Sequence, residues 1–175
     1  MCLCTHRRCE KANMDHLDRL ESKSVYILRE AYANFDNLGM LWSIGKDSTV
    51  LLWLARKAFF GHVPFPLIHV DTTYKIPEMI EYRDRLAAEW KLNMIYGTNE
   101  EAVKSKKTYP EGNAGRVECC KLLKTKALRD TLMGTGSRYV FDHDKGGYVK
   151  DESGEIFTGI IAGIRSDEEG SRSKE

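Results

Sequence analysis

The sequence predicts an α/β fold, a doubly wound and mainly parallel five-stranded sheet with helices on both faces. Short apolar runs typical of buried strands alternate with longer segments of helical period along the chain. Glycine and proline separate these segments, as at Gly61, Pro64 and Pro66. Because strands that alternate with helices form parallel sheets, ligands are expected beyond the carboxyl ends of the strands.

The predicted elements alternate along the chain. Helices are predicted over residues 14–35, 48–60, 77–91 and 118–133, and strands over 38–42, 66–70, 92–96, 139–141 and 160–164. Pro77 suits the first turn of the third helix. The first helix carries an apolar stripe that we expect to be buried, formed by Leu17, Leu20, Ile27, Leu28, Ala31 and Phe35.

The length of 175 residues predicts one domain, which we place at residues 14–175 after a flexible tail over 1–13. Residues 142–157 are rich in Gly, Asp and Lys, and we expect a surface excursion there, with a hairpin turn at Gly146-Gly147 or Ser153-Gly154. The sequence ends in a charged run without a closing element. We therefore expect the domain to be incomplete at its C-terminus.

Composition excludes several classes of protein. The hydrophobic content of 42% and charged content of 30% are ordinary for a globular domain. A net charge of +1 gives no electrostatic case for binding nucleic acid. No apolar run approaches the roughly 18 residues that span a membrane, and no signal peptide opens the chain. With five cysteines and no export signal, we expect reduced thiols and a cytoplasmic location.

One short segment carries most of the chemical information, the octapeptide of residues 43–50 (SIGKDSTV). It joins a predicted strand to a predicted helix, a geometry that presents backbone N–H groups and a helix N-terminus to phosphate. A Walker A loop does not fit, because Gly39 and Gly45 are separated by five residues and Asp47 follows Lys46. The expected phosphate-binding residues are Ser43, Ile44, Gly45, Lys46, Asp47 and Ser48.

The chemistry of these residues differs by position. Gly45 permits close approach of the backbone to an anion, and Lys46 supplies a mobile positive charge. Ser48 could also cap the helix, whereas Asp47 could either cap the helix or approach a Mg²⁺ ion. Ile44 resists a positive φ, so we expect an ordinary backbone conformation there.

A second cluster follows the strand over residues 66–70. Asp71 stands at the end of this strand, where it could orient Mg²⁺ or a ribose hydroxyl; the alternative is a turn or helix-cap residue. His69 lies inside the apolar strand, and we interpret it as a hydrogen-bonded core histidine rather than a catalyst.

A third cluster follows the last predicted strand. Gly163 precedes a charged run in which Arg165 and Arg172 are candidates for binding sulfate or phosphate, because the planar guanidinium matches an oxyanion. Asp167 and Glu168 could pair with these arginines. The alternative is an ordinary solvated surface.

The loop resembles the S-x-G-K-D-S loop of PP-loop ATP pyrophosphatases, which cleave ATP between the α- and β-phosphates. Together with residues 51–59, 64–87 and 162–175, it resembles the small, catalytic subunits of bacterial sulfate adenylyltransferases, within the phosphoadenosine phosphosulfate reductase superfamily. The resemblance runs from about residue 38 to 175, interrupted at 142–157. It implies an adenine nucleotide alpha hydrolase-like fold.

The resemblance also implies a reaction, in which ATP and sulfate give adenylyl sulfate and pyrophosphate, with Mg²⁺ accompanying ATP and a GTPase large subunit as partner. The loop would hold pyrophosphate, with Lys46, Arg165 and Arg172 in catalysis. Trp42 and Val70 would flank adenine, with Asp71 and Gly163 also in the ATP site. Neither a nucleic acid nor a membrane is an expected partner.

Two alternatives to this function remain open, the first being a sulfonucleotide reductase or another sulfur-handling PP-loop protein. Cys119-Cys120 resembles the cysteine pair of sulfonucleotide reductases, which bind an iron–sulfur cluster together with a later Cys-x-x-Cys. No Cys-x-x-Cys occurs in the sequence, so no iron–sulfur cluster is expected within it. The competing interpretation of the pair is two buried, apolar helix residues. The other alternative is an inactive nucleotide-binding module.

Overall fold

The computed structural model of the chain describes residues 15–108 and 111–164. Its strands are β1 (Leu38–Leu41), β2 (Leu67–Val70), β3 (Met94–Thr98), β4 (Ser137–Asp142), β5 (Gly147–Lys150) and β6 (Gly159–Ile161). Its helices are α1 (His16–Asn34), α2 (Lys46–Ala58), α3 (Pro77–Glu89), α4 (Glu100–Lys104), α5 (Arg116–Cys120), the π-helical η1 (Lys121–Lys126) and α6 (Ala127–Leu132).

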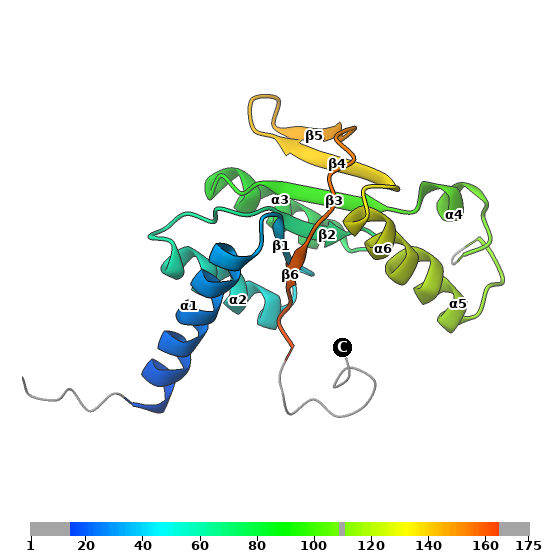
Figure 1. The fold of residues 1–175 in the computed structure, drawn as a ribbon. Helices are drawn as coiled ribbons and strands as arrows, with labels where there is room; N and C mark the ends of the chain where they lie inside the picture. The colour runs from blue at the N-terminus through cyan, green and yellow to red at the C-terminus, as the bar shows by residue number, and fades with distance from the viewer. Residues whose placement is uncertain (1–14, 109–110, 165–175) are drawn as a thin grey trace, which may run out of the picture.

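The described strands form one sheet in the order β5-β4-β3-β2-β1-β6. Strands β3, β2, β1 and β6 are parallel, whereas β4 and β5 run antiparallel to their neighbours. The predicted α/β arrangement is confirmed, but the sheet has six strands instead of five. The additional strand is β5, and Figure 1 shows the β4–β5 hairpin at one edge of the sheet.

Two cores cover the two faces of this sheet. On one face α1, α2 and α3 bury the side chains of alternate strand residues, among them Met40, Trp42 and Leu67. On the other face α6 packs through Leu128 and Leu132 on Ile68 and Ile95. Because successive strand residues point to opposite faces, apolar residues at both parities require helices on both sides.

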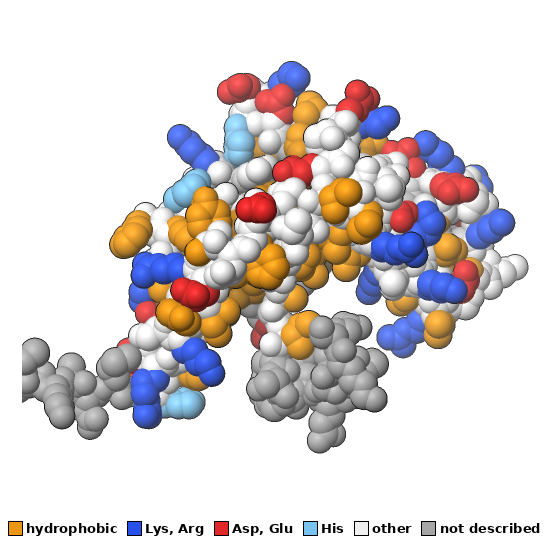
Figure 2. Space-filling view, viewed as in Figure 1, with side chains coloured by type: hydrophobic (Ala, Val, Ile, Leu, Met, Phe, Trp, Pro, Cys, Tyr) orange, Lys and Arg blue, Asp and Glu red, His pale blue; other side chains and the backbone are white. Residues whose placement is uncertain are grey.

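The predicted burial of the α1 stripe is wrong for most of its members. Leu28 is buried, but Leu17, Leu20, Ile27 and Phe35 are each about half exposed or more. Figure 2 shows hydrophobic side chains at the surface along α1. The segment does form a helix, but α1 packs mainly on α2, and contact with one helix covers only part of its apolar face.

The predicted helix over residues 118–133 is a continuous helical segment with a π-helical middle. η1 follows α5 directly and leads into α6, and Ala127 and Leu123 are buried along it. A π-bulge adds one residue to a helical turn, and the spacing of apolar residues in the sequence does not predict where such a bulge forms. Among the described residues, no helix is long and apolar enough to cross a membrane.

The segment after β4 folds back onto the sheet and is fastened by one arginine. Arg138 is almost fully buried in β4, where its guanidinium pairs with Asp151 and donates to the Glu155 carbonyl and the Ser153 hydroxyl, each at 2.7 Å. The β4–β5 turn joins Asp142 to Gly147, with Gly146 at positive φ. The segment is therefore part of the sheet edge and its packing.

Close packing between β3 and α6 depends on a missing side chain. A Cβ atom at Gly97 would lie 1.9 Å from the Thr131 hydroxyl, whereas one at Gly147 would meet nothing within 4 Å. We expect Gly97→Ala to lower the free energy of unfolding by about 1–3 kcal/mol, because α6 must shift to admit the methyl group. Urea denaturation measures this, with Gly147→Ala as the control, and equal stabilities of the two variants would contradict the packing described.

Candidate functional site

The predicted phosphate loop connects β1 to α2. Gly45 is the N-cap of α2, and the helix begins at Lys46, two residues before its predicted start. The predicted capping role of Ser48 is wrong, because the N-cap is Gly45, which makes no side-chain cap hydrogen bond. The Ser48 hydroxyl instead donates to the Gly45 carbonyl at 3.0 Å and lies 3.1 Å from the Ser43 hydroxyl. Within the described part of the chain, Gly45 therefore offers no N-cap side chain to the first N–H groups of α2, and these groups can bind an anion.

The charged residues of the loop lie at the surface. Lys46 Nζ is 2.7 Å from the Asp47 carboxylate, and the two side chains are 87% and 61% exposed. An exposed pair of this kind contributes little to stability. Lys46 can therefore leave Asp47 for a phosphate ligand at small cost to the fold.

Ile44 does not have the ordinary backbone conformation predicted for it. Its φ is 68°, in the left-handed region where β-branched residues are rare. The side chain is partly buried against the core that α1, α2 and α3 form. This packing favours isoleucine, while the turn between β1 and α2 demands a φ better suited to glycine, so the loop stores backbone strain.

A pocket of about 640 Å³, which we call the loop pocket, opens beside this loop at the carboxyl ends of β1 and β2. It contains three predicted site residues, Trp42, Ser43 and Val70. The other residues that line it are Leu41, Ile68, Thr72, Tyr74, Lys75, Lys124, Thr125 and Leu128. Two lysines and no carboxylate occur among these described lining residues, so the pocket favours an anionic ligand.

His69 is the buried histidine that the sequence predicts. Its Nδ1 lies 2.8 Å from the Trp42 carbonyl, and its Nε2 accepts a hydrogen bond from Lys75 Nζ. Burial, with the Lys75 charge as the next cause, lowers the pKa of His69 to about 4. The imidazole is therefore neutral near pH 7, which fits a hydrogen-bonding role inside the core.

Lys75 extends this contact to the loop pocket. Its Nζ also donates to the Val70 carbonyl at 3.0 Å. Burial lowers the pKa of Lys75 to about 8, with Asp71 opposing the effect and Arg83 and Lys124 adding to it. The ammonium group is thus held in a setting that disfavours its positive charge.

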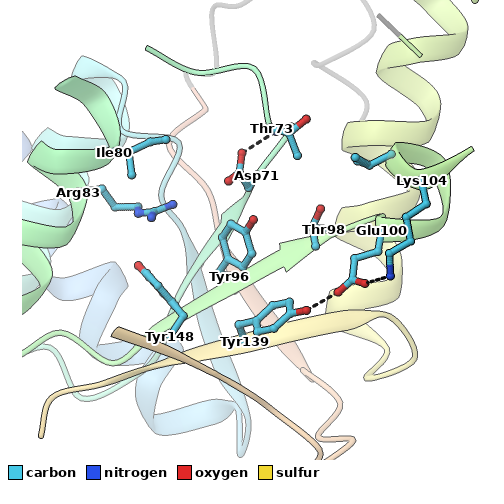
Figure 3. A pocket seen from close by; sticks show the side chains of 11 residues that line it. Asp71, Thr73, Ile80, Arg83, Tyr96, Thr98, Glu100, Lys104, Tyr139 and Tyr148 are labelled. Carbon is cyan, nitrogen blue, oxygen red and sulfur yellow. Dashed lines mark hydrogen bonds and ion pairs between the residues drawn. The ribbon is translucent and has the colours of Figure 1, made fainter. Parts of the chain in front are cut away.

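Asp71 lines a different pocket, on the α3 face of the sheet, which we call the tyrosine pocket. Figure 3 shows Asp71 there with Tyr96, Tyr139 and Tyr148, and its carboxylate accepts from the Thr73 N–H at 2.7 Å. This is the turn-residue alternative for Asp71. The two predicted Mg²⁺ ligands, Asp71 and Asp47, are not gathered among the residues of one described pocket.

The tyrosine pocket is balanced in charge, unlike the loop pocket. Glu100 pairs with Lys104 at 2.6 Å and accepts from the Tyr139 hydroxyl, while Arg83 pairs with Asp84 at 2.7 Å. Burial is the main cause that raises the pKa values of Tyr96 and Tyr148, so both stay protonated. This pocket therefore offers less attraction to a polyanion than the loop pocket does.

The third predicted cluster is described only at its start. A Cβ atom at Gly163 would lie 3.6 Å from the Asp47 carbonyl, which places Gly163 beside the first turn of α2. Arg165 and Arg172 lie outside the described residues, as do Asp167 and Glu168. The structure thus brings the end of the β6 segment to the phosphate loop.

One interpretation of the sequence predicted that both cysteines of the pair are buried, and this prediction is wrong. Cys120 is exposed and Cys119 half-buried in α5, with Cys119 Sγ 3.5 Å from the Ala114 carbonyl. The sequence pattern identified the helix but not its face. The N-terminal cysteines Cys2, Cys4 and Cys9 lie outside the described residues.

Sequence reasoning missed both lysines of the loop pocket, Lys75 and Lys124. Lys75 follows Asp71 in the loop after β2, and Lys124 is an exposed residue of η1 that also lines the loop pocket. The position of Lys75 shortly after a strand is a signal that could have identified it as a site residue. The contribution of η1 depends on how that helix crosses the sheet and has no local signal.

Comparison with known proteins identifies the family. Residues 37–175 match the model of the phosphoadenosine phosphosulfate reductase domain. The chain belongs to this family. The matched region begins immediately before β1 and includes both pockets, so the loop pocket is part of the shared domain.

Several similar proteins are sulfate adenylyltransferase subunits. The chain is 48% identical over 141 residues to sulfate adenylyltransferase subunit 2 of Geotalea uraniireducens, covering 79% of this chain and 44% of that protein. It is 43% identical over 162 residues to sulfate adenylyltransferase subunit 2 of Agrobacterium fabrum, covering 91% and 44%. The chain therefore spans a little under half the length of these relatives.

A solved structure supports the fold. The crystal structure of phosphoadenylyl-sulfate reductase from Candida auris, a phosphate complex, matches with a TM-score of 0.50 and 18% identity, covering 85% of this chain and 77% of that chain. At this identity the likeness concerns the arrangement of the elements. It agrees with an adenine nucleotide alpha hydrolase-like fold.

The strain at Ile44 gives a test with an unusual sign. At an ordinary φ, glycine is about 0.5–1 kcal/mol less stable than alanine, but at a left-handed φ only glycine escapes the steric penalty. Both Ile44→Gly and Ile44→Ala lose the packing of the Ile44 side chain beyond Cβ, and the backbone term should outweigh the remaining methyl group, so we expect the glycine variant to be more stable by about 0.5–1 kcal/mol. Chemical denaturation compares them, and a more stable alanine variant would contradict the φ of 68°.

Proposed function

We propose that the protein transfers the adenylyl group of ATP to sulfate, giving adenylyl sulfate and pyrophosphate. The observation that carries this proposal is the loop pocket, in which Ser43, Trp42 and Val70 meet two lysines without a carboxylate among the described lining residues. An anionic nucleotide fits this combination of an apolar wall and positive charge. The choice of sulfate as the acceptor of the adenylyl group rests on the names of the similar sulfate adenylyltransferase subunits.

The reaction asks little covalent chemistry of the protein. A sulfate oxygen attacks the α-phosphorus of ATP, and the bond from that phosphorus to the pyrophosphate oxygen breaks. Sulfate is already ionised, so neither a general base nor a protein nucleophile is needed. The work of the chain is to align the two anions and stabilise the charge on the departing pyrophosphate.

The loop residues suit the leaving group. The N–H groups at the start of α2 and the Ser43 hydroxyl can donate to phosphate oxygens, and Lys46 can approach from the surface. The strand ends at Trp42 and Val70 would flank adenine. Arg165 and Arg172, beyond the described residues, are proposed to bind sulfate or phosphate.

We expect Mg²⁺ to enter with ATP. Among residues 15–108 and 111–164, no cluster of three or more His, Cys, Asp or Glu could hold a metal ion. This donor set fits an ion carried mainly by the phosphates with a single carboxylate such as Asp47, the usual arrangement for Mg²⁺ bound to nucleotides. Its chemical contribution would be to neutralise charge on the leaving pyrophosphate.

A partner subunit belongs to the same proposal. The similar proteins are named as subunit 2, which indicates that those proteins act with another subunit. We propose a large partner subunit for this chain as well, with GTPase activity as the finer assignment. A sulfonucleotide reductase is less well supported, because the reductase structure is 18% identical whereas the adenylyltransferase subunits reach 43–48%.

The reaction is tested by exchange of labelled pyrophosphate into ATP. Because the reversal of adenylyl transfer passes label only when the acceptor is present, we expect exchange with sulfate and none without it. The assay is run with the chain alone and with a candidate large subunit. Exchange that does not depend on sulfate, or ATP that fails to bind, would overturn the proposed function.

Lys46 offers a mutational test. We expect Lys46→Ala to weaken ATP binding by about tenfold, the effect of losing one charge-assisted hydrogen bond. Its side chain is 87% exposed, so the free energy of unfolding should change by less than about 0.5 kcal/mol. Calorimetric titration with ATP measures the affinity.

Lys57→Ala is the matched control for Lys46, because Lys57 lies in the last turn of the same helix and pairs with Glu21. Its ATP affinity should equal that of the unaltered chain. Unchanged ATP affinity in Lys46→Ala would count against the assignment of the loop.

A further inference from the structure

We propose that Lys75 is a second phosphate-binding cation of the loop pocket and that His69 positions it. This inference rests on the proposed function, because it takes ATP as the ligand of the pocket. Lys75 lines the pocket together with Ser43 of the loop, whereas His69 lies beneath it in the core. The chemical group bound would be a phosphate oxygen of the nucleotide.

The tautomer of His69 follows from its partners. The Trp42 carbonyl can only accept a hydrogen bond, so Nδ1 at 2.8 Å must carry the hydrogen. Nε2 then presents a lone pair, which accepts from Lys75 Nζ. The neutral ring is therefore a rigid acceptor aimed at the lysine.

His69 connects Lys75 to the root of the phosphate loop. Trp42, which accepts the His69 hydrogen bond, immediately precedes Ser43, and its indole Nε1 donates to the Thr49 hydroxyl in α2 at 3.2 Å. Trp42 is fully buried, as is His69. The lysine is thus located relative to the loop through a chain of buried contacts, which preorganises the site at low entropic cost.

The contacts of Lys75 leave capacity for a ligand. An ammonium group has three N–H donors, and the described residues take two of them, at His69 Nε2 and the Val70 carbonyl. No carboxylate of the described residues lies at ion-pair distance from Lys75 Nζ; Asp71 acts on it only as a nearby charge. A half-buried cation in this state gains most from an anionic partner.

The surrounding charges point in the same direction. Lys124 lines the same pocket from η1, and Arg83 acts on Lys75 from α3, so both add positive potential at the lysine. Asp71 offsets part of it. A triphosphate entering the loop pocket would meet Lys75 and Lys124 in addition to the loop.

The test compares two ligands, ATP and adenosine, on the same variants. We expect Lys75→Met to weaken ATP binding by at least about tenfold while leaving adenosine binding unchanged, because the lysine contacts phosphate and not the base. Lys75→Arg should keep most of the ATP affinity. Lys150→Met, an exposed lysine of β5, is the control and should bind both ligands like the unaltered chain.

The positioning role of His69 is tested by two substitutions. His69→Leu removes the acceptor and should weaken ATP binding several-fold without affecting adenosine. His69→Gln can place an amide oxygen near the position of Nε2, so it should restore part of the ATP affinity. A His69→Leu variant with full ATP affinity would remove His69 from the proposal.

Labelling of the unaltered chain gives a measurement that does not depend on a folded variant. Acetic anhydride modifies accessible lysines, and mass spectrometry locates them. We expect ATP to protect Lys75 and not Lys150, and adenosine to protect neither.

The outcomes separate the two proposals. If the unaltered chain binds ATP but Lys75 is neither protected nor needed, the role of Lys75 is wrong and the proposed function stands. Equal loss of ATP and adenosine in Lys75→Met also overturns the inference, since it indicates a structural role. If the unaltered chain binds neither ligand, both proposals fail.

Discussion

The structure depends on the parallel pairing of β1 with strands on both of its sides. Backbone hydrogen bonds to β2 and β6 and apolar packing on both faces fix the direction and depth of β1. The chain leaves this strand at Trp42 and must turn at once into α2. The phosphate loop therefore begins at the end of a strand that is paired on both sides, and the sheet fixes where the loop starts.

Backbone strain gathers at this same edge. Among the described residues, Ile44 and Thr73 are β-branched residues with positive φ, and they follow β1 and β2 respectively. Each strained backbone conformation costs of order 1–3 kcal/mol, and packing of the surrounding sheet and helices must offset this cost. Ile44 follows Ser43 of the loop pocket, whereas Thr73 lines the tyrosine pocket, so a strained residue lies beside each pocket.

The sequence predicted what local period and local motif can reveal. The α/β class, the strands that lead to Trp42 and Val70, the loop and the buried His69 all follow from runs of a few residues.

Predictions failed where the answer depends on distant parts of the chain. The apolar stripe of α1 packs mainly on one helix, α2, and the exposure of Cys120 depends on how α5 lies. The φ of Ile44 is imposed by the strand before it and the helix after it. The contact of Lys75 with His69 joins a loop to a core strand, which no linear pattern displays.

The place of β6 beside β1 has a consequence for folding on the ribosome. Leu38 pairs with Gly159, so the strand that carries the loop lacks one neighbour until nearly all of the described chain has been synthesised. Strands β1 to β3 can pair early, but their edge stays open to other chains during that interval. Such long-range pairing slows folding, and chaperones that shield open sheet edges would matter most at this stage of translation.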